Sequence, residues 1–460
     1  MNKLILYNTL TKNLDQITRV GEHFTVYFCG PTVYNRAHIG NFRTYLVEDV
    51  LVRILKLEGY KPLVARNITD VDDKTIRDSQ KAELSLSKFT ERYTKLFHDD
   101  CSALNILSPD IEPCATEHIA DQIKLIQTLI DNGTAYVSDG SVYFRVRAFQ
   151  QYGQLSNISN RELQTQLVDS AGKRNLADEY DRDSVSDFVL WKARKPEDGE
   201  VFWDSPWGEG RPGWHIECSA MSMKYLGHTI DLHAGGMDLC FPHHENEIAQ
   251  SEAATHEPFV RYWVHIAHLM VNGTKMSKSL GNMYSLEDIS DAGFSPEALR
   301  YCLLSGHYRQ PLNFTMNSLS AANNALKKLQ TFSEKLPERK SHEKPEHWQF
   351  LGDAYQALLN DLNIPLCLGN IFKTISKISL KSDNIEIIAQ EFGTLQYALG
   401  LQLKQRAELD IPDNIRSLAQ TRWEAKLQKN YKLSDEIRLK LESDGWIIKD
   451  SASGYTITKR

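Results

Sequence analysis

The feature that most constrains the fold of this chain is an apolar strand that runs into a glycine-containing turn and then into a helix. Residues 24–28 are β-branched or aromatic, a composition typical of a buried strand. Residues 41–59 carry apolar side chains at helical spacing, which predicts a helix. The turn between them has the sequence CGPTVYNRAHIGN. Such a unit predicts an open, parallel α/β sheet, in which ligands bind at the carboxyl ends of the strands.

The turn carries groups that suit a nucleotide. The start of the helix would offer backbone N–H groups to a phosphate. His38 could add a hydrogen bond, and Gly40 leaves room for a flat ring to approach the backbone. Cys29 is expected at the end of the strand, facing the same crevice. An ordinary βα turn with a buried cysteine would show the same pattern, because short motifs recur by chance.

Composition narrows the class of protein. The 460 residues are too many for one core and predict about three domains. The chain has no apolar run of membrane-spanning length and no start that resembles a signal peptide, so we expect a cytosolic protein without membrane contact. Seven cysteines, an odd number, do not suggest a disulfide framework. The formal net charge of −7 excludes wholesale coating of nucleic acid but allows local basic patches.

The predicted fold is α/β: a doubly wound, parallel-sheet (Rossmann-like) domain with an insertion, then an α-helical bundle and a small C-terminal α/β module. The expected boundaries are 1–115 for the first half of the sheet domain, 116–203 for the insertion, 204–255 for the second half, 256–315 for a region after the sheet, 316–404 for the bundle and 405–460 for the C-terminal module. Helical spacing predicts helices over 82–101, 115–133, 319–336, 349–362, 371–380 and 385–401. Residues 169–187, within the insertion, are polar and offer little to bury.

A second apolar strand, residues 62–68, ends in Thr69 and Asp70. Polar residues directly after such a strand lie at the ligand edge of the sheet, where these two could contact an amino group or hydroxyls of a reactant. The alternative is that Thr69 and Asp70 only cap the next helix.

Histidines and a glutamate gather further along the chain. A short strand at 230–232 places His233 at its carboxyl end, and Pro242 is expected in the first turn of a helix. On that helix His243 and Glu247 would share a face, because residues four apart do so. The partner of His244 at the same spacing is an isoleucine, which cannot bind a metal, so the spacing selects His243.

A zinc site follows from these residues and two cysteines. Zinc accepts thiolate, imidazole and carboxylate ligands, so Cys218, His243 and Glu247 supply three and Cys29 could supply a fourth. Each residue also has a plainer reading, since a lone buried cysteine usually belongs to the core and a His–Glu pair on a helix is usually a surface contact.

A third informative stretch, residues 275–279, reads KMSKS and is followed by Gly281. Two lysines in a small, glycine-flanked loop suit a mobile clamp on a polyphosphate. A loop of this composition can equally be a solvated surface segment.

Taken together, these stretches resemble a known family. His38-Ile-Gly-Asn41 and the KMSKS loop resemble the HIGH and KMSKS signatures of class I aminoacyl-tRNA synthetases. Asn41 departs from the second histidine of most of that class, and the HIGN form is usual in its cysteine-specific branch. The blocks FCGPTVY, NITDVDD, GWHIECSAM, FPHHENE and RYCLL resemble bacterial-type cysteinyl-tRNA synthetases, and the resemblance covers nearly the whole chain.

The resemblance implies a fold, an activity and a set of site residues. Cysteine and ATP, the latter with Mg²⁺, would give cysteinyl-adenylate, and the cysteinyl group would pass to the terminal adenosine of tRNA(Cys). The resemblance assigns one zinc ion per chain to Cys29, Cys218, His243 and Glu247, and the amino-acid pocket to Thr69, Trp214 and His233. It assigns ATP binding and catalysis to His38, Gly40, Asn41, Lys275 and Lys278. An amide never carries charge, so Asn41 is expected to act as a neutral group. We expect a monomer.

The last third of the chain fits the same resemblance. The four predicted helices between 316 and 404 suggest a bundle, which resembles the family's anticodon-stem domain. From residue 411 onward ten Lys and Arg face seven Asp and Glu, a local excess of positive charge on an acidic chain. Two basic helices, with Arg422, Lys426, Lys429, Lys432, Arg438 and Lys440, and a hairpin over 446–458 suit RNA, although surface helices are often basic in any protein.

Two other functions are compatible with parts of this pattern. One is a ligase that joins the cysteinyl-adenylate to an amino sugar, and the other is a catalytically silent tRNA-binding protein. The extended bundle and the basic C-terminus argue against the first, because a small acceptor needs no anticodon contacts. Intact HIGN and KMSKS motifs and all four metal candidates argue against the second.

Overall fold

The computed structural model describes residues 3–158, 187–276, 281–337, 343–381, 383–403, 412–428, 430–451 and 454–459. The polar stretch at 169–187 falls outside these ranges except for its last residue. The chain divides into two compact units: Met1–Phe332 with Leu336–Gln402, and Ser333–Lys335 with Leu403–Arg460. No helix in the described ranges is both long and apolar enough to cross a lipid bilayer.

A four-stranded parallel sheet lies at the centre of the first unit. Its spatial order is β10 (Val260–Ile266), β9 (Ile230–Gly236), β3 (Phe24–Phe28), β4 (Pro62–Arg66). From β3 the chain continues to β4 at one edge of the sheet. More than 150 residues later it returns to β9, beside β3, and continues to β10 at the opposite edge. The boundary between β3 and β9 is therefore a topological switch point, where ligands of such sheets bind.

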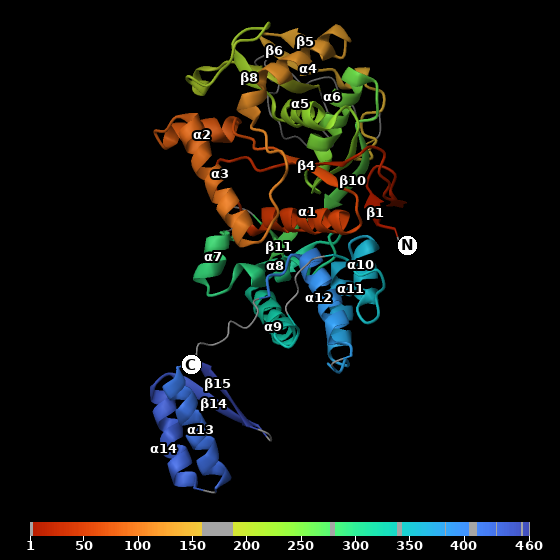
Figure 1. The fold of residues 1–460 in the computed structure, drawn as a ribbon. Helices are drawn as coiled ribbons and strands as arrows, with labels where there is room; N and C mark the ends of the chain where they lie inside the picture. Colours follow the sequence, from red (N-terminus) through yellow and green to blue (C-terminus); the bar gives the residue numbers. More distant parts are fainter. Residues whose placement is uncertain are drawn as a thin grey trace. The chain divides into compact units, whose positions relative to one another are not determined.

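Helices cover both faces of this sheet. Figure 1 shows α1 (Ile39–Leu57) on one side of the strands and α5 (Trp214–Leu226) on the other. The strands are accordingly apolar along most of their length, as expected for parallel strands without a solvent-exposed face. The expected strand–turn–helix unit is confirmed, with the helix beginning at Ile39.

Some helices begin or end at other residues than the sequence predicted, and in these cases capping residues set the helix ends. The helix expected over 82–101 is α3 (Leu86–Ala103), which begins later because Glu83 has a left-handed φ of 55° and Ser85 caps α3 by accepting from Lys88 N. A separate helix, α2 (Asp73–Lys81), precedes it. Over 115–133 a 3₁₀ turn, η1 (Ala115–His118), precedes α4 (Ile119–Asp131).

The insertion carries its own antiparallel sheet of four strands: β5 (Ala135–Ser138), β6 (Ser141–Phe144), β7 (Phe188–Ala193) and β8 (Gly210–Pro212). Its core includes Phe144, Phe188, Trp191 and Ile126 from α4. This core also contains Ile216 of α5 and Ala249 of α6 (Glu245–Thr255), so the small sheet is packed on the helices that hold the metal candidates.

Beyond the sheet, the chain forms short elements and then a bundle. The elements are β11 (Leu269–Val271), β12 (Thr274–Lys275), α7 (Leu286–Asp291), α8 (Pro296–Leu304), β13 (Leu312–Phe314), α9 (Met316–Ser333), α10 (Gly352–Leu359), α11 (Ile364–Ile375) and α12 (Ile385–Leu399). The helix expected over 371–380 begins earlier, because Asn363 caps it by accepting from Leu366 N. Arg300 of α8 donates a hydrogen bond to Leu399 O of α12 and forms an ion pair with Asp49 of α1. These two contacts connect the bundle to the sheet domain.

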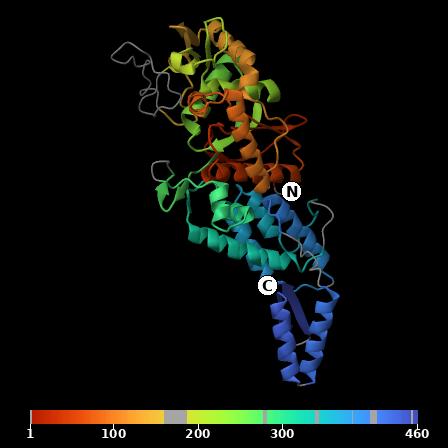
Figure 2. The ribbon, with the colours of Figure 1, turned by 90° about the vertical axis from the view of Figure 1, so that its left-hand side faces the viewer.

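The second unit contains α13 (Asp413–Leu427), α14 (Tyr431–Ser443) and the hairpin β14 (Trp446–Ser451)–β15 (Gly454–Lys459). The two helices lie side by side with the hairpin against them (Figure 2). Arg422, expected among the RNA-facing basic residues, is instead 4% exposed and donates to both carboxylate oxygens of Asp450. Lys426 also donates to Asp450, but its side chain stays 39% exposed. Lys429 lies outside the described residues.

Candidate active site

The four metal candidates converge on one point. Cys29 follows β3, Cys218 lies on α5, His243 lies in the turn Cys240–His244 before α6, and Glu247 is on α6. One ligand atom from each lies within 4.8 Å of the others, and all four residues are buried. The Cys29 and Cys218 sulfurs are 3.9 Å apart, and His243 Nε2 is 3.1 Å from Glu247 Oε1.

The geometry of this cluster fits a metal better than it fits hydrogen bonding. Two thiolates at about 2.3 Å from a tetrahedral zinc ion lie about 3.8 Å apart, close to the observed sulfur separation. His243 Nε2 has no hydrogen-bond partner although it is buried and close to a carboxylate. Burial raises the pKa of the Cys29 thiol and lowers the pKa of His243, and a bound cation would favour the thiolate over the thiol. The donor set is therefore one that zinc would accept.

His244, which the spacing argument set aside, and His233, expected in the amino-acid pocket, also lie at this cluster. Cys29, His233, His244 and Glu247 form a second group whose ligand atoms lie within 4.8 Å of one another. His244 Nε2 is 3.5 Å from Cys29 Sγ, and His233 Nε2 is 3.0 Å from Glu247 Oε2. The helix that was expected to have Pro242 in its first turn begins only at Glu245. A wider turn precedes it, in which Phe241 is extended and His244 N donates to Leu239 O, so helical spacing does not apply there.

The cluster lies at one end of a crevice of about 410 Å³ at the switch point of the sheet. Its lining includes residues predicted to bind the metal, the amino acid and ATP. They are Cys29 for the metal, Trp214 for the amino acid, and His38, Gly40, Asn41 and Lys275 for ATP. Trp214 stacks on His243, with ring centroids 4.2 Å apart, and so connects the crevice wall to the metal cluster. Lys278 lies outside the described residues.

Thr69 and His233, which were expected in the amino-acid pocket, are not part of the crevice surface among the described residues. Both are buried, with exposed fractions of 1% and 0%. Asp70 is not the helix cap either, since Asp72 caps α2 and Asp70 accepts hydrogen bonds from Thr116 N and Oγ1. Asn67 and Glu217, which sequence reasoning did not select, both hydrogen bond with Thr69 Oγ1. The available signal was a glutamate among the small and apolar side chains of residues 216–221.

His38 and Asn41 form a reciprocal cap at the start of α1. His38 Nδ1 accepts a hydrogen bond from Asn41 N (3.2 Å), and Asn41 Oδ1 accepts one from His38 N (3.1 Å). Because Nδ1 is an acceptor, the proton of a neutral His38 lies on Nε2, which is then a donor. The expectation of several unused N–H groups at this helix end is wrong in part, since Ile39 N donates to Tyr284 O and Phe42 N donates to His38 O.

The segment after the KMSKS loop is bound directly to this cap. His38 forms an antiparallel bridge with Ser285, and Arg36 pairs with Glu287 of α7 and with Asp100 of α3. On the other side of the loop, a side chain at Gly40 would lie 3.1 Å from Met276 Sδ. Gly40 therefore permits the close approach of the loop to the helix end.

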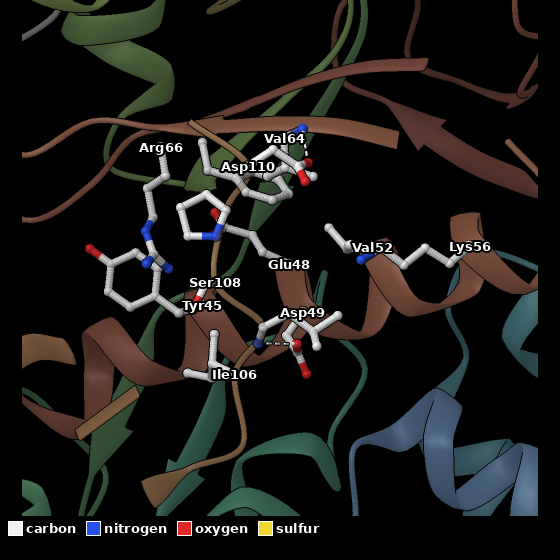
Figure 3. A pocket seen from close by; sticks show the side chains of 13 residues that line it. Tyr45, Glu48, Asp49, Val52, Lys56, Val64, Arg66, Ile106, Ser108 and Asp110 are labelled. Atoms are coloured by element: carbon white, nitrogen blue, oxygen red, sulfur yellow. Dashed lines mark hydrogen bonds between the residues drawn. The ribbon is translucent and has the colours of Figure 1, made fainter. Parts of the chain in front are cut away.

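Another, much smaller pocket lies between α1, β4 and residues 106–110 (Figure 3). Its volume of about 20 Å³ has room for about one water molecule and excludes a nucleotide or an amino acid. Glu48 Oε1 and Arg66 Nε line it, are buried and have no hydrogen-bond partner. Burial raises the pKa of Glu48 well above its usual value, although Arg66 opposes the shift.

The chain is similar to a known protein family and to individual proteins of that family. Residues 16–324 match the family model described as the tRNA synthetases class I (C) catalytic domain. The chain is 47% identical to a cysteine–tRNA ligase of Opitutus terrae, over 99% of this chain and 98% of that protein. It is 45% identical to the one of Chlamydia muridarum and 42% identical to the one of Brachyspira hyodysenteriae, over 99% of each chain.

Solved structures of similar fold confirm the predicted fold class. Mycobacterium tuberculosis methionyl-tRNA synthetase bound by methionyl-adenylate gives a TM-score of 0.56 at 15% identity, over 82% of this chain and 90% of that chain. A LeuRS from Agrobacterium radiobacter in a ternary complex with tRNA gives 0.58 at 12% identity, over 84% of each. Because the family model matches more than half of the chain and the sequence relatives extend over nearly all of it, this chain belongs to the cysteine–tRNA ligase family of the class I aminoacyl-tRNA synthetases.

Proposed function

We propose that this protein activates L-cysteine with ATP and transfers the cysteinyl group to the terminal adenosine of tRNA(Cys). One observation carries the proposal: Cys29 belongs both to the crevice and to the metal cluster. The crevice is lined by His38, Asn41 and Lys275, and the cluster consists of buried thiol, imidazole and carboxylate groups. Relatives at 42–47% identity, named cysteine–tRNA ligases, support the same activity.

We infer that one zinc ion per chain is held by Cys29, Cys218, His243 and Glu247, with His233 and His244 packed against them. When bound, zinc would supply a soft Lewis acid that prefers a thiolate to a neutral hydroxyl and so separates cysteine from serine. The protein residues around the cluster keep bulk water out, since Cys218, His243 and Glu247 are at most 1% exposed. His233 Nε2 would donate to Glu247 Oε2, 3.0 Å away, and so fix the direction of that carboxylate.

In the adenylation step, the residues of this chain would act mainly by position and charge. His38 would donate from Nε2 to the nucleotide, held in this tautomer by Asn41. Asn41 stays neutral, and its side-chain oxygen holds the His38 backbone. Lys275 and Lys278 would neutralise the phosphates of ATP, which enters with Mg²⁺, while the cysteine carboxylate attacks the α-phosphate in line.

The transfer step requires contact with tRNA. We propose that residues 256–315 and the bundle over 316–404 face the tRNA stem, and that the module at 405–460 binds the anticodon. Exposed Lys432 and Lys440 on α14, with Tyr431 exposed by 60%, supply positive charge and a stacking surface of the kind that single-stranded RNA uses. A monomeric state and a cytosolic location stay predictions.

Neither rival function receives support from the comparisons. The relatives match the chain through the bundle and the C-terminal module, which a ligase for a small amino sugar does not need. The motifs and the metal candidates that a silent RNA-binding protein could lose are all present.

The test is pyrophosphate exchange measured with each amino acid in turn, followed by charging of tRNA. Cysteine alone should support exchange, and tRNA(Cys) should accept the product. Exchange with cysteine but no charging of tRNA would favour the amino-sugar ligase, and absence of exchange with every amino acid would favour the silent protein.

A further inference from the structure

A buried arginine of α1 is bonded to the segments that lead into the strands around Lys275. Arg43 lies near the start of α1, the helix that His38 caps, and is 1% exposed. Its guanidinium donates to four backbone carbonyls: Ala267 O (3.1 Å), Leu303 O (2.9 Å), His307 O (3.1 Å) and Gln310 O (2.8 Å). A guanidinium carries five N–H groups in a fixed fork, so four bonds determine both its position and its direction.

Two neighbouring strands begin next to these carbonyls. Ala267 lies shortly before β11, and Gln310 lies shortly before β13. These strands are parallel neighbours in a three-stranded sheet, and the third strand, β12, pairs with β11 and carries Lys275. The two strand starts are also joined to each other, because Leu312 N donates to His268 O. Arg43 therefore holds the end of the three-stranded sheet at which β11 and β13 begin.

The same helix also meets the other end of the β11–β12 pair. Both β11 and α8 lie next to α1 (Figure 1). Lys275 and Met276 line the crevice together with His38, and a Cβ at Gly40 would lie 3.1 Å from Met276 Sδ. His38, Gly40 and Arg43 belong to the start of one continuous helix and keep fixed positions relative to one another. The position of Lys275 relative to His38 therefore depends on the carbonyl contacts of Arg43.

The chemistry of the contact indicates a fixed link rather than mere filling of space. None of the four acceptors is a carboxylate, and burial lowers the pKa of Arg43 to about 10. Leu303 O belongs to the last turn of α8, where the partial negative charge of the helix end favours a cation. An apolar side chain would fill the same volume without the cost of burying a charge. The guanidinium adds directed bonds from α1 to the start of β11, the end of α8 and the segment before β13.

We propose that Arg43 is a positioning residue that sets the placement of Lys275 relative to His38 by fixing the three-stranded sheet to α1. Arg43 is buried and acts through backbone carbonyls, without contact to the nucleotide. The inference rests on the proposed function for the reaction that is measured. It goes beyond that function by giving a role to a residue outside both signature motifs.

The test is the rate of adenylate formation in Arg43→Lys. Lysine keeps the positive charge, but its single nitrogen cannot reach four carbonyls in three segments. The rate is measured in a single turnover by rapid quench, on the full-length, zinc-loaded protein with cysteine and saturating ATP and Mg²⁺. It should fall about 10–100-fold, the loss expected when a reacting group is slightly misplaced. The dissociation constant for cysteine should stay nearly unchanged, because no contact of Arg43 reaches the metal cluster.

A matched control and a double variant separate positioning from general support of the fold. Arg53 lies on the same helix, is 3% exposed, and donates to Tyr397 O and Asn105 O, which lie outside the three-stranded sheet. Arg53→Lys should lower the midpoint of urea unfolding but leave the rate of adenylate formation unchanged. Lys275→Ala should slow the Arg53→Lys protein by the same factor as the unaltered protein. In Arg43→Lys it should add little, because Lys275 is already displaced there.

Three results would overturn the proposal: an unchanged rate in Arg43→Lys, an equal loss in Arg53→Lys, or fully multiplicative losses with Lys275→Ala. If Arg43→Lys does not fold, hydrogen exchange of the unaltered protein decides. The amides of Ala267 and Leu312 should then be protected as strongly as those of β9, and faster exchange would show that the three-stranded sheet moves independently of α1. Failure of the proposed function is a different result, because the unaltered protein itself would then form no adenylate with any amino acid.

Discussion

Adding cysteine to the zinc-loaded protein should raise the number of sulfur atoms bound to the metal from two to three. The starting number comes from the structure, in which the sulfurs of Cys29 and Cys218 are 3.9 Å apart, as two thiolates on one tetrahedral ion would be. The third sulfur is the thiol of the substrate, which reaches the cluster through the crevice end at Cys29. Each sulfur should lie at about 2.3 Å and each nitrogen or oxygen at about 2.0–2.2 Å.

X-ray absorption at the zinc edge measures these neighbours directly. Serine serves as the matched ligand, because its hydroxyl should not enter the shell and the count should stay at two. In Cys218→Ser the protein should retain the metal less tightly, and the count should begin at one. If the number of sulfur neighbours does not rise with cysteine, the metal is structural and the discrimination between cysteine and serine must arise elsewhere.

Three further predictions concern the C-terminus, the cap and the small cavity. Ending the chain at residue 403 should leave cysteine-dependent pyrophosphate exchange largely intact but weaken tRNA charging; equal losses in both assays would mean that the segment is structural. Asn41→Ala should cost about 0.5–2 kcal/mol in urea unfolding, the range for a lost cap, and slow single-turnover adenylate formation; an unchanged rate would remove Asn41 from the positioning of His38. The raised pKa of Glu48 means that the folded chain keeps a proton which the unfolded chain loses near pH 4.3, so its contribution to stability falls as pH rises. The stability of Glu48→Gln relative to the unaltered protein should therefore increase from pH 5 to pH 8, and a constant difference would contradict the raised pKa of Glu48.

The sheet and the metal candidates could be predicted because local chemistry decides them. An apolar run followed by a glycine-containing turn has few alternatives, and thiol, imidazole and carboxylate groups are the only side chains that zinc accepts. The same reasoning failed for His244, because the wide turn before α6 replaces helical spacing where Phe241 is extended.

Other features depend on partners that are distant in the sequence. From the sequence, Asp70 could be either a ligand contact or a helix cap. Its actual partner is Thr116, which is 46 residues away in the chain. Arg422 looked like an RNA contact, yet Asp450 on the hairpin neutralises it. The contact of Thr69 with Glu217 joins two elements that are distant in the sequence, and periodicity within one element cannot show such a contact.

The metal cluster draws its residues from both halves of the sheet, and this has a consequence for synthesis of the protein. Cys29 leaves the ribosome early, but Cys218, His243 and Glu247 follow only after the whole insertion has been made. The ion cannot find its full set of ligands until β9 pairs with β3, a contact that closes a loop of about 200 residues and is slow for that reason. Metal uptake should therefore be a late event, and metal retention would report that the central sheet has been assembled completely.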